Sequence, residues 1–294
     1  MRASVDTLMR ALQALILATF LAAIHGGAAA QGDAKRGAYL AKAGGCVGCH
    51  TEAKKDAVPY AGGRALKTPF GTFYGPNITP HPSAGLGRWR EADFVRALRQ
   101  GLRPDGSHYF PAFPYPSFTR ISDADLRDLW VYLRALPPSA RANQAHDLRF
   151  PFGWRFLVAG WKWLFFSPGA LVADAKQPAQ VQRGAYLVQA LGHCGECHTA
   201  RNFLGGPKRD RVLAGAARGP VGDRIPNLTP TRLKKWSDGE LKDFLRSGLT
   251  PDGDVVGETM GEVIRNTTAE LTADDLAALI GYLRSLPSIP DEPD

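Results

Sequence analysis

Two copies of one five-residue motif constrain this sequence of 294 residues more than any other feature. They read Cys46-Val-Gly-Cys49-His50 and Cys194-Gly-Glu-Cys197-His198, and together they contain all four cysteines of the chain. Cys-x-x-Cys-His is the attachment pattern of c-type haem, because two thiols at this spacing can add to the two vinyl groups of one porphyrin. The histidine that follows then lies against the iron as an axial ligand. We therefore expect two covalent haem c groups, with His50 and His198 as iron ligands.

Other uses of paired cysteines explain the motifs less well. Four cysteines in an exported chain could form two disulfides, and a Cys-x-x-Cys pair could be a thioredoxin-type redox site or half of a zinc site. None of these explains why a histidine directly follows both pairs.

The first thirty residues have the features of a secretory signal. Arg2 and Arg10 precede an apolar run over residues 11–24, and small residues lead to Ala28 and Ala30. The apolar run is shorter than the ~20 residues that a spanning helix needs. A cleaved signal over 1–30 is the prediction, and an uncleaved membrane anchor is the alternative. Since c-type haem is attached outside the cytoplasm, we expect a periplasmic protein, free or at the outer face of the inner membrane.

The chain also contains an internal repeat. Several landmarks recur in the same order at a spacing of 147 or 150 residues: Arg36-Gly-Ala-Tyr-Leu40 with Arg183-Gly-Ala-Tyr-Leu187, Asn77-Ile-Thr-Pro80 with Asn227-Leu-Thr-Pro230, Trp89 with Trp236, and Tyr132–Pro137 with Tyr282–Pro287. We call residues 36–137 the first repeat and 183–287 the second repeat. This order predicts a cytochrome c domain at 31–138, a connector at 139–180 and a second cytochrome c domain at 181–290.

Helices are predicted around these landmarks, and strand patterns are scarce. Ser122 and Thr272 are N-cap candidates before amphipathic runs, and Ser237 with Glu240 forms a capping box. We expect an all-α protein with two tandem class I cytochrome c-like domains, each folded around one haem c.

The connector is rich in aromatic residues. Its segment 154–166 is too short to span a bilayer, and Arg155 and Lys162 interrupt it. We expect an aromatic clasp packed between the domains. The alternative is a docking surface for a partner subunit or a membrane face.

The second axial ligands should differ between the two haems. Met260 is the only methionine after the predicted signal and lies where a distal ligand belongs, so we assign it to haem 2. The 147-residue offset places Phe113 at the matching position, and phenylalanine cannot bind iron. His108 is the preferred candidate for haem 1. An open iron beside Phe113 is the alternative, followed by ligation through His81, His146, Tyr109 or a lysine.

Longer stretches strengthen these interpretations. They are Pro76–Pro80 with Gly87-Arg-Trp89, Pro111–Pro116, Gly192–Thr199 with Arg201-Asn202, and Asn227–Pro230 with Trp236. Over nearly the whole chain after the predicted signal, the sequence resembles the dihaem and trihaem cytochrome c subunits of bacterial membrane-associated dehydrogenases. Those subunits receive electrons from alcohol-, gluconate-, sorbitol- or aldehyde-oxidising partners.

The resemblance implies that four residues, Asn77, Trp89, Asn227 and Trp236, lie near the haem edges and propionates. The sequence departs from the alcohol dehydrogenase type in having only two haem motifs and Phe113 in place of a methionine. The second departure puts a simple relay role for haem 1 in doubt.

These features favour an electron-transfer subunit. We expect electrons to come from a dehydrogenase and to leave to a small cytochrome, a quinone or an oxidase, entering at haem 1 and leaving through the higher-potential haem 2. No acid–base pair or nucleophile stands out, so enzymatic activity stays open. The alternatives are a haem enzyme that reduces peroxide or oxidises a sulfur compound, and a sensing module. The net charge of +8 is spread without a dense basic run, which argues against nucleic-acid binding. Peripheral membrane association is a further option.

Overall fold

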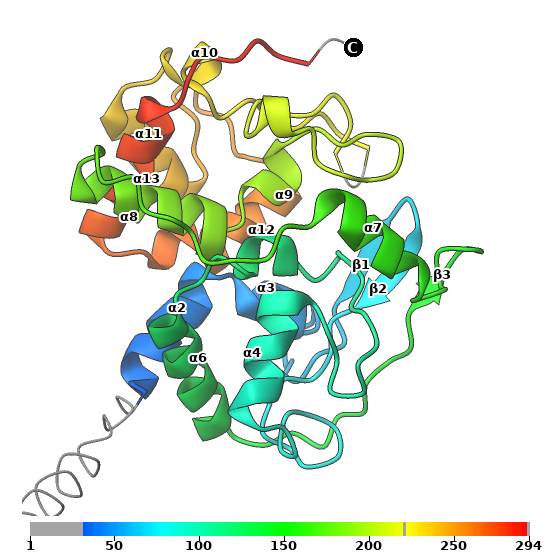
Figure 1. Ribbon diagram of the computed structural model, residues 1–294. Coiled ribbons are helices and arrows are strands. Elements are labelled where there is room, and N and C mark those ends of the chain that lie inside the picture. The colour runs from blue at the N-terminus through cyan, green and yellow to red at the C-terminus, as the bar shows by residue number, and fades with distance from the viewer. Residues whose placement is uncertain (1–31, 220–221, 293–294) are drawn as a thin grey trace, which may run out of the picture. The chain divides into compact units, whose positions relative to one another are not determined.

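The computed structural model describes residues 32–219 and 222–292 (Figure 1). The predicted signal over residues 1–30 lies outside these residues. The first repeat contains α2 (Ala34–Ala43), α3 (Cys46–His50), α4 (Glu91–Gln100), α5 (Tyr115–Phe118) and α6 (Asp123–Ala135). The connector contains α7 (Leu157–Phe165). The second repeat contains α8 (Ala179–Tyr186), η1 (Leu187–Leu191), α9 (Gly195–His198), η2 (Arg209–Arg211), α10 (Pro230–Leu233), α11 (Asp238–Ser247), α12 (Glu258–Asn266), η3 (Thr268–Glu270) and α13 (Ala273–Ser285).

In each repeat the first and last helices pack directly against each other, α2 with α6 and α8 with α13 (Figure 1). The crossing point is a glycine in both pairs. A Cβ atom on Gly37 would lie 2.0 Å from the carbonyl oxygen of Asp128, and one on Gly184 would lie 1.9 Å from that of Ala278. Real Cβ atoms do not approach a carbonyl so closely, so only glycine lets these helix backbones meet.

The helix caps lie where the sequence predicted them. The hydroxyls of Ser122 and Thr272 accept hydrogen bonds from the backbone N–H groups of Asp125 and Asp275, at 3.1 and 3.2 Å. Ser237 forms the capping box of α11 with Glu240. Short polar side chains before the apolar runs therefore fix where these helices begin.

A single π-helical turn, η1, distinguishes the second repeat from the first. The Arg-Gly-Ala-Tyr-Leu motifs are 147 residues apart, whereas the cysteine pairs are 148 apart, so the second repeat has one additional residue in between. A π-turn absorbs one inserted residue without ending the helix. The insertion therefore leaves the haem motif at the same place after the helix.

The mostly helical fold agrees with the sequence prediction, but a small antiparallel sheet adds to it. Strand β2 (Gly71–Tyr74) lies between β1 (Ala65–Thr68) and β3 (Asp147–Leu148), with Ala65 paired to Tyr74. These strands are two to four residues long, and the pairing of β2 with β3 joins distant parts of the chain. Strands this short show no clear alternation of polar and apolar residues, which is why the pattern was missed.

Buried apolar side chains from both repeats form one continuous cluster. Leu40, Leu126 and Leu129 represent the first repeat in this cluster, and Leu191 and Leu276 represent the second. The division at residues 138 and 180 stays a prediction. In the described part of the chain no helix has the length and apolar character to cross a membrane.

Helix α7 of the connector contacts both repeats, but several aromatic residues on it and just before it are exposed. Lys162 donates to the carbonyl of Gln100, and the indole N–H of Trp161 donates to the carbonyl of Leu204 at 3.1 Å. Phe156 and Trp163 remain exposed. The expected aromatic clasp is therefore wrong for the outer side of this helix.

The glycine crossing gives a test of the packing. Gly184→Ala should lower the free energy of unfolding by about 1–3 kcal/mol, because the added methyl group would collide with the α13 backbone. Gly281→Ala is the matched control, since a Cβ there meets nothing within 4 Å. It should raise stability by up to about 1 kcal/mol through helix propensity. Urea unfolding of both variants measures the difference, and equal effects would contradict the close crossing.

Candidate haem-binding sites

Both cysteine pairs begin directly after a left-handed residue and continue into a short helix, with Cys194 as the N-cap of α9. Gly45, at φ 62°, precedes α3, and His193, at φ 40°, precedes α9. A left-handed residue turns the chain sharply after the long first helix, and histidine adopts this conformation more readily than most residues do. The two motifs therefore begin in the same backbone geometry.

The four thiols are kept protonated. All four cysteines are unpaired. Burial raises the pKa of Cys46 and Cys194 to about 12 and that of Cys49 to about 11, and it also raises the pKa of Cys197. A thioredoxin-type site needs the opposite shift. Within residues 32–219 and 222–292, no group of three or more His, Cys, Asp or Glu side chains could hold a metal ion. The redox-site and zinc-site alternatives thus gain no support.

The two histidines are oriented in the same way. Nδ1 of His50 lies 2.7 Å from the carbonyl oxygen of Pro76, and Nδ1 of His198 lies 2.7 Å from that of Pro226. Because a carbonyl only accepts, Nδ1 carries the proton in each ring and Nε2 keeps its lone pair. Burial lowers the pKa of both rings, which favours the neutral form. An imidazole whose Nδ1–H is held by a carbonyl is the usual state of a histidine metal ligand.

The donor set therefore fits covalent haem. Each motif supplies two thiols and one imidazole nitrogen with an available lone pair, in sequence order, from one short helix and, in the second motif, its N-cap. Sequence reasoning missed the orienting carbonyls of Pro76 and Pro226. The signal was present, because both prolines directly precede the repeated Asn-x-Thr-Pro motif.

Asn77 and Asn227 hold the loops that carry these carbonyls. Both side chains are buried. Oδ1 of Asn77 accepts from the N–H and hydroxyl of Thr79, and its Nδ2 donates to the carbonyl of Ser139 at 2.8 Å. Asn227 repeats this with Thr229 and the carbonyl of Ile289. These amides bond to protein groups, so their contact with haem propionates stays a prediction.

Trp89 and Trp236 are half-buried against the core cluster. The ring of Trp236 lies 5.2 Å from that of Phe244, in an edge-to-face arrangement. Among the described residues neither indole N–H has a hydrogen-bond partner. Both donors are therefore available to an acidic group such as a propionate.

The two positions that the sequence proposed for the distal ligands have different surroundings. Met260 lies on α12, half-buried against the core cluster. Its counterpart Phe113 lies just before α5, with its ring 5.3 Å from Tyr109 and 5.8 Å from Phe118. An aromatic group thus occupies the position at which the second repeat has a thioether.

His108 lies against the connector helix. Its Nδ1 is 3.2 Å from Nζ of Lys162, and its carbonyl accepts from Arg155 at 2.9 Å. Burial, together with the charge of Lys162, lowers the pKa of His108. The neutral ring has one lone pair, and in this arrangement Lys162 donates to it. Ligation of iron by His108 would require this contact to break. The His108 assignment stays a prediction, and this contact favours its alternative, an open iron beside Phe113.

The chain is similar to several known proteins. The family pattern described as Cytochrome c matches residues 34–137. A protein of Cereibacter sphaeroides named "Diheme cytochrome c-type" is 45% identical over 88% of this chain and 87% of its own length. The cytochrome c subunit of the quinone alcohol dehydrogenase of Gluconobacter oxydans is 38% identical over 94% of this chain and 59% of its own length. The cytochrome c subunit of the gluconate 2-dehydrogenase of Pantoea cypripedii is 36% identical over 95% of this chain and 65% of its own length.

Two thiols followed by a histidine form the attachment pattern of c-type haem. Similarity over most of both chains to a dihaem member supports the same class. The chain therefore belongs to the cytochrome c family. Membership implies covalently bound haem c.

The distal asymmetry can be tested with carbon monoxide on the dithionite-reduced protein. We expect the natural protein to bind it at one haem, because Phe113 offers no ligand and the lone pair of His108 is occupied. Met260→Ala should raise binding to two haems per chain. His108→Gln, which keeps a polar side chain of similar size, should leave the count unchanged. Difference spectra give the stoichiometry, and an increase in His108→Gln would show that His108 is a ligand.

Proposed function

We propose that this protein is a dihaem electron carrier. It takes single electrons from a dehydrogenase partner and passes them to a small cytochrome, a quinone or an oxidase. The observation that carries the proposal is the duplicated arrangement of two thiols and a histidine whose Nδ1–H is held by a proline carbonyl. Relatives named as cytochrome subunits of alcohol, gluconate and fructose dehydrogenases support a dehydrogenase as the donor.

The residues have separate tasks in this function. Cys46, Cys49 and His50 would hold one haem, and the corresponding cysteines and histidine at 194, 197 and 198 the other. Haem iron supplies reversible one-electron chemistry. The protein contributes attachment, a fixed tautomer of the histidine, and apolar surroundings that exclude water.

The distal residues give the transfer a direction. A methionine ligand raises the reduction potential relative to other ligand sets, and Met260 belongs to the second repeat. The first repeat, with Phe113 at the matching position, would then be the lower-potential end. Electrons would enter at the first repeat and leave through the second.

The function is tested by counting haems and following their reduction. We expect two haems per chain in the pyridine haemochrome assay and two separate steps in a redox titration. Adding the chain's cognate dehydrogenase with substrate should reduce both haems. His198→Ala should remove the higher-potential step and retain the lower one. One haem per chain, or no reduction by the dehydrogenase, would overturn the proposal.

The distal arrangement of the first repeat also favours a second function. If iron there is open beside Phe113, it can bind an exogenous ligand such as peroxide, with the second haem exchanging the electrons. Turnover of peroxide or a sulfur compound that depends on His50 and survives Met260→Leu would support this haem enzyme over a simple carrier.

The outer side of α7 forms a surface that suits a membrane. We define the aromatic face as the exposed apolar side chains of α7 and the adjoining loops: Phe150, Phe152, Trp154, Phe156, Leu157, Trp163, Leu164, Phe203 and Leu204. The loop carrying Phe203 lies against α7, because the carbonyl of Leu204 accepts from Trp161. Phe203 is 93% exposed and Trp163 is 85% exposed.

Helix α7 exposes large apolar side chains although its cation does not point to solvent. Its cation points inward, since Lys162 donates to Gln100 and lies 5.2 Å from the ring of Tyr115. Nearby, Arg155 lies over the ring of Phe110 at 4.5 Å. Side chains that protrude this far suit the fluid lipid–water interface, where tryptophan and phenylalanine are favoured. Exposed Arg149 and Arg209 flank the face and would favour anionic lipid.

We propose that the aromatic face associates with the membrane surface on the periplasmic side. Trp163→Ser and Phe203→Ser should each weaken binding to phosphatidylglycerol-containing vesicles about tenfold, taking about 1.5 kcal/mol for each ring withdrawn from water. Val255→Ser, at an exposed apolar residue on another loop, is the control and should bind as the natural protein does. Vesicle co-sedimentation measures this. Unchanged binding in both aromatic variants would exclude this face, and loss of dehydrogenase binding instead would assign it to the protein partner.

A further inference from the structure

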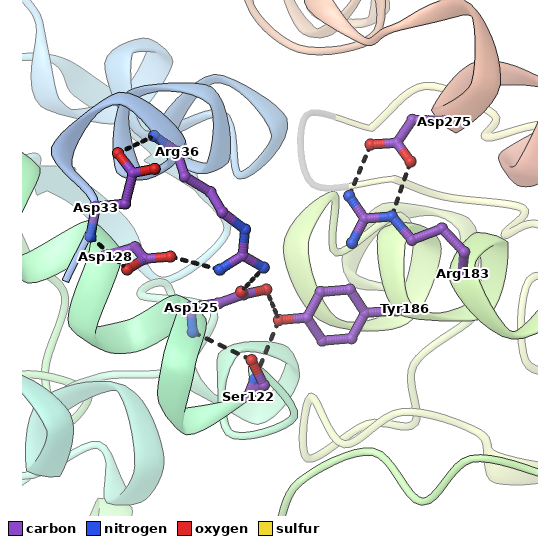
Figure 2. A network of polar contacts seen from close by, with 8 residues as sticks. All are labelled: Asp33, Arg36, Ser122, Asp125, Asp128, Arg183, Tyr186 and Asp275. Atoms are coloured by element: carbon purple, nitrogen blue, oxygen red, sulfur yellow. Dashed lines mark hydrogen bonds and ion pairs between the residues drawn. The ribbon is translucent and has the colours of Figure 1, made fainter. Parts of the chain in front are cut away.

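Haem attachment does not account for the tyrosine of the repeated Arg-Gly-Ala-Tyr-Leu motif. The hydroxyl of Tyr186 donates to Oδ2 of Asp125 at 2.5 Å and accepts from the N–H of Ser122 at 3.1 Å (Figure 2). The hydroxyl of Tyr39 donates to Oδ2 of Asp275 at 2.5 Å and accepts from the N–H of Thr272 at 3.2 Å. Each tyrosine therefore makes the same two hydrogen bonds, and each makes them to the other repeat.

The groups that the tyrosines contact are the caps of the last helix in each repeat. Ser122 is the N-cap of α6 and Asp125 its third residue, and Thr272 and Asp275 hold the same positions in α13. In the ordinary capping box of α11, the carboxylate of Glu240 accepts directly from the N-cap N–H at 2.6 Å. In α6 and α13 a tyrosine hydroxyl lies between these two groups, accepting from one and donating to the other.

Arginines from the same motif hold the carboxylates in place. Arg36 pairs with both Asp125 and Asp128 within the first repeat (Figure 2). Arg183 binds Asp275 through Nε at 2.8 Å and Nη2 at 2.7 Å within the second repeat. Aspartate is shorter than the glutamate of a capping box, and here an arginine holds its carboxylate. The carboxylate therefore does not accept from the N-cap N–H, which needs another acceptor. The tyrosine of the other repeat provides that acceptor.

The tyrosines are suited to act as donors. Burial raises the pKa of both Tyr39 and Tyr186, and the hydrogen bond to an aspartate raises it further, so the hydroxyls stay protonated. Asp125 and Asp275 are buried carboxylates. Without the tyrosine hydroxyls, Oδ2 of Asp125 would have no partner among the described residues, and Oδ2 of Asp275 would keep only Arg183.

The boundary at which the two repeats meet also brings each haem motif into contact with the other repeat. Ser117 of the first repeat donates to Oε1 of Glu196, which lies between Cys194 and Cys197, at 2.8 Å. The ring of Phe118 lies 5.4 Å from that of His193, which directly precedes the second motif. In the opposite direction, helix α3 with the first motif contacts α12.

An ion pair between Arg64 and Glu262, at 2.6 Å, joins the repeats at the same boundary. A Cβ on Gly45 would lie 2.9 Å from the hydroxyl of Thr267 in the second repeat. The contacts that hold the two repeats together therefore also set the separation and orientation of the two attachment sites.

We propose that Tyr39 and Tyr186 are positioning residues that interlock the two repeats, each capping the last helix of the other, and thereby fix the geometry between the two haems. The inference rests on the proposed function only in assuming that both motifs carry haem. It requires no dehydrogenase and no acceptor.

The test uses the purified holoprotein and a variant lacking both hydroxyls, Tyr39→Phe with Tyr186→Phe. The first readout is the paired positive and negative Soret circular dichroism signal of two nearby haems, which depends on their separation and orientation. The second is urea unfolding, followed by Soret absorbance and by far-ultraviolet circular dichroism. We expect the variant to lose the paired signal and to replace a single unfolding transition with two.

Tyr282→Phe is the matched control. Its hydroxyl accepts a hydrogen bond from Nε2 of Gln189, at 2.5 Å, within the second repeat. This variant removes one buried tyrosine hydroxyl and leaves the hydrogen bonds of Tyr39 and Tyr186 in place. It should lose some stability, yet keep the paired signal and the single transition.

The outcomes separate this inference from the proposed function. A double variant with an unchanged paired signal and one unfolding transition would overturn the interlock, whatever its reduction by a dehydrogenase. If the double variant does not fold, the single variants carry the test, and each should weaken the paired signal. If the natural protein shows no paired signal, the claim that the tyrosines fix the geometry between the haems is overturned. The number of unfolding transitions then decides whether the tyrosines interlock the repeats.

Discussion

The close crossing of the first and last helix in each repeat governs the rest of the structure. Gly37 and Gly184 let the helix backbones touch, and neighbouring positions in the same five-residue motif then have defined surroundings. The preceding arginine reaches an aspartate at the start of the last helix. The tyrosine two positions later reaches the other repeat. Since the cysteine pair follows directly after this helix, the crossing also determines where each attachment site begins.

Much of the fold could be predicted because its signals are local. Ser122, Thr272 and Ser237 marked helix starts through short polar side chains, and all three do cap helices. The Cys-x-x-Cys-His pattern and the repeat spacing together indicated two equivalent sites. The additional residue between Leu187 and Cys194 was visible as a change of spacing, and the structure accommodates it in one π-helical turn.

Features that depend on distant partners could not be predicted in this way. The pairing of β2 with β3 and the carbonyl contacts of Pro76 and Pro226 link segments far apart in the chain. The outward face of α7 was only the alternative to a buried clasp, for a different reason. An apolar segment is normally taken to be buried, but here Lys162 finds its partners inside, and Phe156 and Trp163 remain exposed.

The shared tyrosine contacts bear on how such a chain can evolve. A duplicated gene starts from two self-sufficient copies, and deletion of one copy restores the ancestor. In this chain the hydroxyl of Tyr39 accepts from the N–H of Thr272, and that of Tyr186 accepts from the N–H of Ser122, so each copy completes the other. Deletion of one copy then no longer restores the ancestor. A surviving single copy would leave a helix end short of one hydrogen bond and a tyrosine without its acceptor. Mutual dependence of this kind preserves the duplication while leaving Phe113 and Met260 free to diverge.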